Sequence, residues 1–148
     1  MKILFCGSFK FLDEMKKLSK ELSSAGFECI LPKFSLGDFP SKKIEKMKNN
    51  RKENGLLNDE EFEKIIKVTK WFYDRLIDCD AMIVFDKDGY VGLSAAAEIG
   101  ATYVLNKPVF FLESPKDFGI RAILEFSENF KVVPFKNLVS ELKRLKKN

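Results

Sequence analysis

Residues 1–31 read MKILFCGSFKFLDEMKKLSKELSSAGFECIL and contain two apolar runs separated by an amphipathic one. The runs Lys2–Cys6 and Phe27–Leu31 are nearly apolar throughout, without alternating polar residues. That pattern is typical of strands buried on both faces, as in a parallel sheet. Between them, Phe11–Ala25 repeats its apolar residues at helical spacing, and Gly26 ends the pattern. The stretch therefore predicts a strand, a helix and a second, parallel strand.

The same alternation continues along the chain. Three more apolar runs predict strands at Ala81–Phe85, Pro108–Leu112 and Lys131–Pro134. Helical patterns cover about 59–78, Leu93–Asn106, Phe118–Phe126 and Phe135–Lys146. Such alternation is typical of an open parallel sheet covered on both faces. We predict an α/β fold, a Rossmann-like or flavodoxin-like three-layer sandwich with a five-stranded parallel sheet. Its order 2-1-3-4-5 is the common one for this class, and the spacing alone does not give it.

The length of 148 residues suits one domain, 1–148. Segment 32–55 interrupts the alternation, because it is long and polar and contains Gly37 and Pro40. It is interpreted as a lid or binding loop, or equally as a surface helix without a role. Lys and Arg gather at 42–52, as in a nucleic-acid patch or a solvated helix face. The mild net charge of +4 favours the solvated face, so we expect no nucleic-acid partner.

The composition excludes several kinds of site. The chain has no histidine, which removes histidine acid–base chemistry and histidine-ligated metals. Its three cysteines, Cys6, Cys29 and Cys79, match no zinc motif and predict small buried apolar groups in a reducing compartment. No apolar run reaches the length of a membrane span or fits a signal peptide. We therefore expect a cytoplasmic protein with no membrane contact, metal or cofactor.

The strand order points to a ligand site before any motif is considered. In open α/β sheets, ligands bind at the carboxyl ends of the strands where the order reverses, here strands 1 and 3. Those ends are Gly7-Ser8 and the loop 86–92, which opens a helix. Gly7 allows close backbone approach, Ser8 offers a hydroxyl, and the helix start offers free N–H groups for a phosphate or carboxylate. The alternative for Gly7-Ser8 is a tight turn without a ligand.

Within this loop, Asp88, Gly89 and Tyr90 are candidate ligand contacts. Asp86 and Asp88 lie at the correct end of the sheet, but their spacing matches no calcium loop, which favours a solvated loop over a metal site. Tyr90 is placed to stack on a base or a sugar, and a core or rim aromatic is the equal alternative.

Glu98 is the most distinctive residue of the chain. It is the only charged side chain in 91–106, although 32% of all residues are charged, and small residues surround it. We expect such a carboxylate to be shielded from water, which raises its pKa toward a catalytic value. The alternative is a glutamate that pairs with Lys or Arg across an interface.

Several stretches within about 3–112 carry a resemblance to a known family. They are Leu4–Ser8, Cys79–Val84, Gly89–Ser94, Ala97–Ala101 and Asn106–Val109. Together they resemble the nucleoside 2-deoxyribosyltransferase-like superfamily, which includes nucleoside deoxyribosyltransferases and 2′-deoxynucleoside 5′-phosphate N-hydrolases. The most specific part is the Glu-Ile-Gly-Ala run followed by Lys-Pro-Val.

The resemblance implies cleavage of the N-glycosidic bond of a 2′-deoxyribonucleoside or its 5′-monophosphate. The glutamate of the family's E-x-G-x-A run, Glu98 here, attacks the anomeric carbon, and the covalent intermediate passes to water or another base. Gly7 and Ser8 help to hold the nucleotide, and the helix start near Gly92 and Ser94 binds a 5′-phosphate or the sugar. The resemblance also implies a homo-oligomer, because a neighbouring subunit often completes the site.

Two positions depart from the family pattern. The family's catalytic aspartate lies eight residues before the one matched by Asp80, and Phe72 stands there. Asp74 is displaced from that position by roughly 200° around a helix. The active-site tyrosine aligns with about Leu4. A nucleophile without these partners supports a second hypothesis, a nucleotide-binding or sensing module without catalysis.

Overall fold

Five strands form one sheet in the structure, a computed structural model that describes residues 1–33 and 59–147. They are β1 (Lys2–Gly7), β2 (Glu28–Ile30), β3 (Ala81–Phe85), β4 (Val109–Phe111) and β5 (Phe130–Val132). Every neighbouring pair is parallel, and the order is β2-β1-β3-β4-β5. The predicted sheet and its strand order are therefore confirmed.

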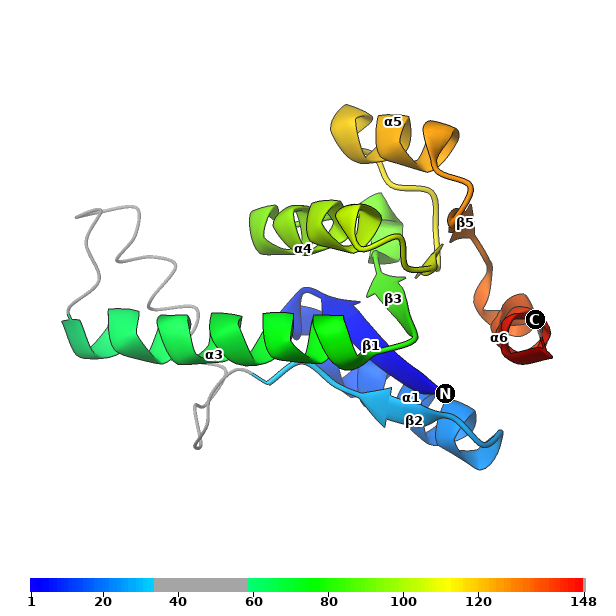
Figure 1. The fold of residues 1–148 in the computed structure, drawn as a ribbon, viewed down its shortest axis with the longest axis horizontal. Helices are drawn as coiled ribbons and strands as arrows, with labels where there is room; N and C mark the ends of the chain where they lie inside the picture. Colours follow the sequence, from blue (N-terminus) through cyan, green and yellow to red (C-terminus); the bar gives the residue numbers. More distant parts are fainter. Residues whose placement is uncertain (34–58, 148) are drawn as a thin grey trace. The chain divides into compact units, whose positions relative to one another are not determined.

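Helices follow the strands along the chain (Figure 1). They are the 3₁₀ turn η1 (Phe9–Phe11), α1 (Leu12–Ser24), α3 (Asp59–Asp78), the 3₁₀ turn η2 (Lys87–Gly89), α4 (Leu93–Val104), α5 (Phe118–Phe126) and α6 (Phe135–Lys147). Helix α4 ends two residues earlier than predicted, and Asn106 takes a left-handed φ of 53° in the turn that follows. Across the described residues, no helix combines the length and apolar character needed to cross a membrane.

The chain divides into two units. The first comprises Met1–Pro32 and Arg75–Asn148, and the second Lys33–Asp74. The first unit contains the sheet with α1, α4, α5 and α6. In the second unit Phe72 is buried, and the ring of Tyr73 meets it edge-on with centroids 6.2 Å apart. Residues 34–55 of the predicted lid and the basic cluster at 42–52 lie outside the described residues, so both stay predictions.

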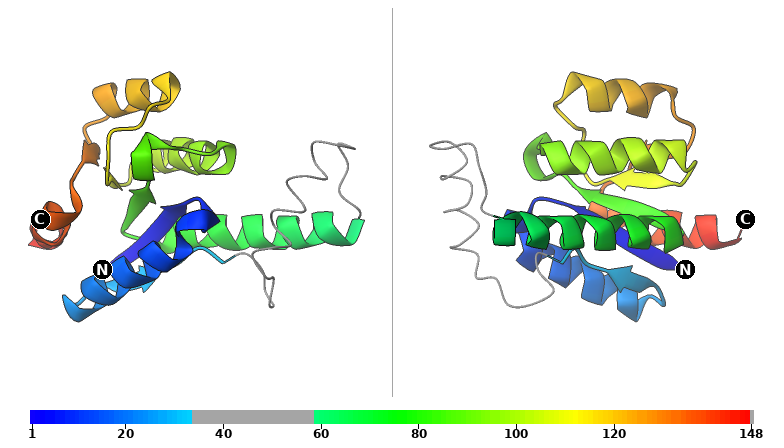
Figure 2. Two further views of the ribbon diagram at one scale, coloured as in Figure 1. Left: turned by 180° about the vertical axis from the view of Figure 1, so that it is seen from behind. Right: turned by 60° about the vertical axis from the view of Figure 1, so that its left-hand side comes forward.

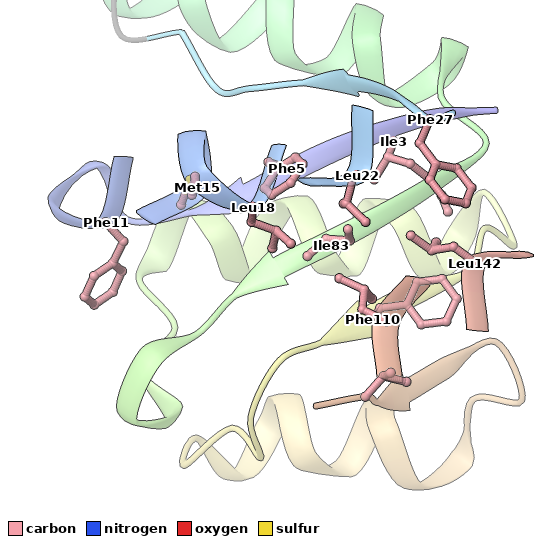
Figure 3. Packing of buried hydrophobic residues seen from close by; sticks show 13 residues of the cluster. Ile3, Phe5, Phe11, Met15, Leu18, Leu22, Phe27, Ile83, Phe110 and Leu142 are labelled. Atoms are coloured by element: carbon pink, nitrogen blue, oxygen red, sulfur yellow. The ribbon is translucent and has the colours of Figure 1, made fainter. Parts of the chain in front are cut away.

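Alternate residues of each strand face opposite sides of the sheet in the first unit. One set packs with α1 and α6, as Figure 3 shows for Ile3, Phe5 and Ile83. Helix α4 lies on the other side (Figure 2). There, Thr102 Oγ1 reaches Met82 Sδ at 3.5 Å. Both faces are thus covered, which explains why the strands carry no polar alternation.

Candidate functional site

The carboxyl ends of β1 and β3 lie side by side, because Gly7 pairs in register with Phe85. Gly7 has a φ of 148°, and a Cβ there would lie 2.7 Å from Phe85 O and 2.8 Å from Met15 Cε. Only glycine fits so closely between β3 and α1. Ser8 follows, and its carbonyl accepts a hydrogen bond from Phe11 N at 3.0 Å. The fold therefore brings the two predicted segments to one edge, but it also gives Gly7 a packing role of its own.

Glu98 reaches from α4 to this edge. The thiol of Cys6, in β1, donates a hydrogen bond to Glu98 Oε2 with a Sγ–Oε2 distance of 3.0 Å. Burial raises the pKa of the Glu98 carboxyl to about 7, and the bond from Cys6 opposes that rise. No Lys or Arg forms an ion pair with Glu98 among the described residues. The side chain therefore has the shielding expected from the sequence, while its catalytic role stays a prediction.

Cys6 is the member of this arrangement that the sequence did not single out. Burial, then the charge and hydrogen bond of Glu98, raise the pKa of the Cys6 thiol well above its usual value, so it stays protonated. Cys6 and Cys79 are buried as predicted, whereas Cys29 is only half-buried. The surroundings of Cys6 are not purely apolar, because its thiol bonds to a carboxylate. The sequence could have indicated this contact through strand alternation, because side chains alternate along β1. Cys6 therefore lies on the face opposite Phe5, which is the face that α4 covers.

Asp86 contradicts the expectation of a solvated loop. Its side chain is completely buried at the end of β3. Its Oδ1 accepts hydrogen bonds from Leu112 N and Glu113 N, both at 3.0 Å, and its Oδ2 has no hydrogen-bond partner among the described residues. Burial raises the pKa of Asp86 to about 6, although these backbone bonds lower it. Asp86 thus ties the loop after β3 to the end of β4.

Asp88 and Gly89 both contact the segment after β4. Asp88 is exposed with a φ of 59°, and its N–H donates to Glu113 Oε2 at 3.0 Å. Gly89 is buried with a φ of 69°, and a Cβ there would lie 2.6 Å from Ser114 O. The glycine is therefore explained by close packing, and ligand contact by either residue stays a prediction.

Tyr90 and the start of α4 lie near the segment after β1. Lys10 Nζ is 4.3 Å from the centroid of the Tyr90 ring and 4.6 Å from that of Phe11. A Cβ on Gly92 would lie 3.4 Å from the Tyr90 hydroxyl. Gly92 precedes α4 without a side-chain cap, and Ser94 is exposed in the first turn. Among the described residues, no side chain caps this end of α4, which leaves its first backbone N–H groups for a ligand.

The two departures from the family pattern have different outcomes. Leu4 is completely buried in β1, two residues before Cys6 and on the same strand face. Phe72 belongs to the second unit, and its replacement of a catalytic aspartate stays a prediction. In the part of the chain that the structure describes, no three Cys, Asp or Glu side chains are grouped to hold a metal ion.

Several solved structures have a similar fold. The 2-deoxyribosyltransferase of Bacillus psychrosaccharolyticus has a TM-score of 0.61 and 18% identity, over 98% of this chain and 96% of that one. The Clostridium botulinum CMP N-glycosidase has a TM-score of 0.53 and 16% identity, over 97% and 99%. The molybdenum cofactor carrier protein of Chlamydomonas reinhardtii has a TM-score of 0.61 and 14% identity, over 99% of both chains.

The sequence itself gives no comparable match. No model of a known protein family matches it. No curated protein matches it either. At identities of 14% to 18% the structural likeness shows the fold alone. The chain therefore shares its fold with these proteins, a 2-deoxyribosyltransferase and a CMP N-glycosidase among them.

Proposed function

We propose that the protein cleaves the N-glycosidic bond of a 2′-deoxyribonucleoside or its 5′-monophosphate, with Glu98 as the nucleophile. The observation that carries this proposal is the environment of the Glu98 carboxylate, which is partly buried, without an ion-pair partner among the described residues, and adjacent to the end of β1. A pKa of about 7 leaves a large ionised fraction near neutral pH. Two proteins of similar fold, a 2-deoxyribosyltransferase and a CMP N-glycosidase, support the same class of reaction.

The proposed reaction has two steps at the sugar. First, an ionised oxygen of Glu98 bonds to C1′ while the C1′–N bond breaks, and the electron pair of that bond leaves with the base. The departing base takes a proton from solvent. The adjacent carboxylate stabilises the oxocarbenium character of the transition state. Second, water or another base attacks C1′ and releases Glu98, which gives hydrolysis or transfer.

Substrate contacts are proposed at the same edge of the sheet. The Ser8 hydroxyl lies directly after β1, and the Tyr90 ring offers a surface for a base or a sugar. The open N–H groups at the start of α4, near Gly92 and Ser94, suit a 5′-phosphate or a sugar hydroxyl. Anchoring the far parts of the substrate in this way brings C1′ to the carboxylate.

Glu98→Gln tests the proposal, because it keeps the size of the side chain and removes the charge that attacks C1′. Wild-type protein is incubated with a panel of deoxynucleosides and their monophosphates, and free base is measured by chromatography. We expect the variant to lower base release by roughly 10³-fold or more. Glu125→Gln, an exposed glutamate of α5, is the matched control and should leave the rate unchanged. If the wild-type protein releases no base at high concentration and long times, the proposal is refuted.

A second candidate function is nucleotide binding or sensing without catalysis. It is supported by the similar fold of a molybdenum cofactor carrier protein and by Phe72 at the position of the family's aspartate. A saturating nucleotide at 100 times its dissociation constant should stabilise the protein by about 2.7 kcal/mol. Thermal stabilisation without base release would favour this function over the first one.

A further inference from the structure

We propose that Cys6 is a positioning residue for Glu98, whose thiol holds Oε2 in place and leaves Oε1 as the oxygen that attacks the sugar. The inference rests on the proposed function of Glu98 and adds the atom that reacts. The contact is a hydrogen bond of 3.0 Å between Cys6 Sγ and Glu98 Oε2. It joins a strand to a helix across 92 residues of sequence.

Cys6 is a rigid anchor. Strand β1 pairs with both β2 and β3, and Cys6 lies opposite Val84 in the β1–β3 register. The Cys6 side chain is completely buried. Gly7, the next residue, is closely packed against β3, so the backbone that carries the thiol has little freedom to move.

The helix end of the contact is also held in place. Thr102 Oγ1, one turn further along α4, donates a hydrogen bond to Glu98 O at 2.7 Å and is completely buried. A glutamate side chain has three rotatable bonds, and one fixed carboxylate oxygen removes most of that freedom. With Oε2 bound to the thiol, Oε1 is the oxygen that remains available for C1′.

The thiol also suits a carboxylate that must react. Asp86, at the end of β3, and Glu98 itself are the described charged groups that face Cys6, and with burial they keep its pKa well above the usual value. Helix α4 carries no charged side chain besides Glu98. A thiol is a weak donor, so it orients the carboxylate and stabilises its charge less than a hydroxyl would. It keeps its proton throughout both steps.

The test compares Cys6→Ser, Cys6→Ala and the wild-type protein by the pH dependence of kcat/KM. In the wild type, activity should rise with pH through about 7 as Glu98 ionises. This rise is the acid limb of the profile. Cys6→Ser should shift the acid limb to lower pH by roughly one unit, and Cys6→Ala should shift it to higher pH by a similar amount. Alanine should also lower kcat about tenfold with little change in KM, because the carboxylate loses its orientation.

Cys79→Ala is the matched control. Cys79 is another buried cysteine of the first unit, and its thiol donates to Leu76 O at 3.3 Å rather than to a carboxylate. Loss of the Cys79 thiol should lower the stability of the protein without moving the acid limb of the pH profile. If Cys6→Ser and Cys6→Ala also leave the limb at the wild-type pH, Cys6 has only a packing role and the proposal is overturned.

A carbon-13 NMR titration of the Glu98 carboxyl, assigned with Glu98→Gln, separates this proposal from the proposed function. A lower Glu98 pKa in Cys6→Ser and a higher one in Cys6→Ala support the contact, and this measurement needs no turnover. An unchanged Glu98 pKa in both variants overturns it. Absence of base release from the whole substrate panel overturns the proposed reaction instead.

Discussion

Asp86→Asn should gain stability relative to the wild-type protein as pH rises from 4 to 7.5, although the native side chain accepts two backbone hydrogen bonds. The carboxyl is completely buried, its Oδ2 has no described partner, and its pKa is raised from 3.8 to about 6. Between these values the folded protein binds a proton that the unfolded chain has already lost. The free energy of unfolding therefore falls as pH rises from about 4 to 6, and it stays reduced above that.

The magnitude follows from the shift. About two units correspond to about 3 kcal/mol at pH 7.5, of which about 0.5 kcal/mol is already present at pH 4. Asparagine does not ionise, and its amide oxygen still accepts from Leu112 N and Glu113 N. The stability difference between variant and wild type should therefore change by about 2.5 kcal/mol in favour of the variant between pH 4 and pH 7.5.

Urea unfolding followed by circular dichroism at both pH values measures this change. The stability difference between variant and wild type at pH 4 is subtracted from the difference at pH 7.5. The new amide hydrogens, which gain no acceptor among the described residues, affect both differences equally and therefore cancel. Asp88→Asn is the control on the same loop, since that carboxylate is exposed. An equal stability difference for Asp86→Asn at pH 4 and pH 7.5 would refute the reasoning, because the buried carboxyl would then ionise alike in the folded and unfolded chains.

Two further predictions concern packing and assembly. Gly7→Ala should destabilise the protein by about 2–4 kcal/mol in urea unfolding, because the new Cβ would lie 2.7 Å from Phe85 O. Gly26→Ala is the control, since a Cβ there meets no atom within 4 Å, and it should cost only about 1 kcal/mol through backbone strain. Leu93 and Val104, at the two ends of α4, are 88% and 80% exposed. We expect light scattering to give the wild-type protein a molar mass that is a multiple of 17.1 kDa, and Val104→Glu should lower that mass. A wild-type mass of 17.1 kDa would contradict the predicted homo-oligomer.

The strands could be predicted because burial on both faces leaves a direct record in the sequence. Ile3 to Cys6 and Ala81 to Val84 are apolar at every position, and all of them are buried. Glu98 could be singled out for the opposite reason, as the one charge in an uncharged helix. Both patterns lie within short stretches of sequence, so they can be recognised without knowledge of the tertiary structure.

Contacts between distant segments could not be predicted in the same way. The loop 86–92 looks polar along the sequence, yet Asp86 is buried because the ends of β3 and β4 meet at its carboxyl. The Cys6–Glu98 bond spans 92 residues, and a cysteine in an apolar strand looks like any small core residue. Gly89 is required by Ser114 and Lys116, which lie beyond the next strand.

The pKa values of Glu98 and Asp86 bear on the choice between an enzyme and a binding module. A rise from 4.5 to about 7 means that Glu98 costs about 3 kcal/mol of stability above neutral pH, which Gln would avoid. That is a large share of a typical net stability of about 5–15 kcal/mol. A carboxylate beside a nucleotide phosphate also repels it, which weakens binding. Under the proposed function, the same charge next to C1′ would stabilise an oxocarbenium-like transition state, so Glu98 would be costly for folding and for binding but useful for catalysis.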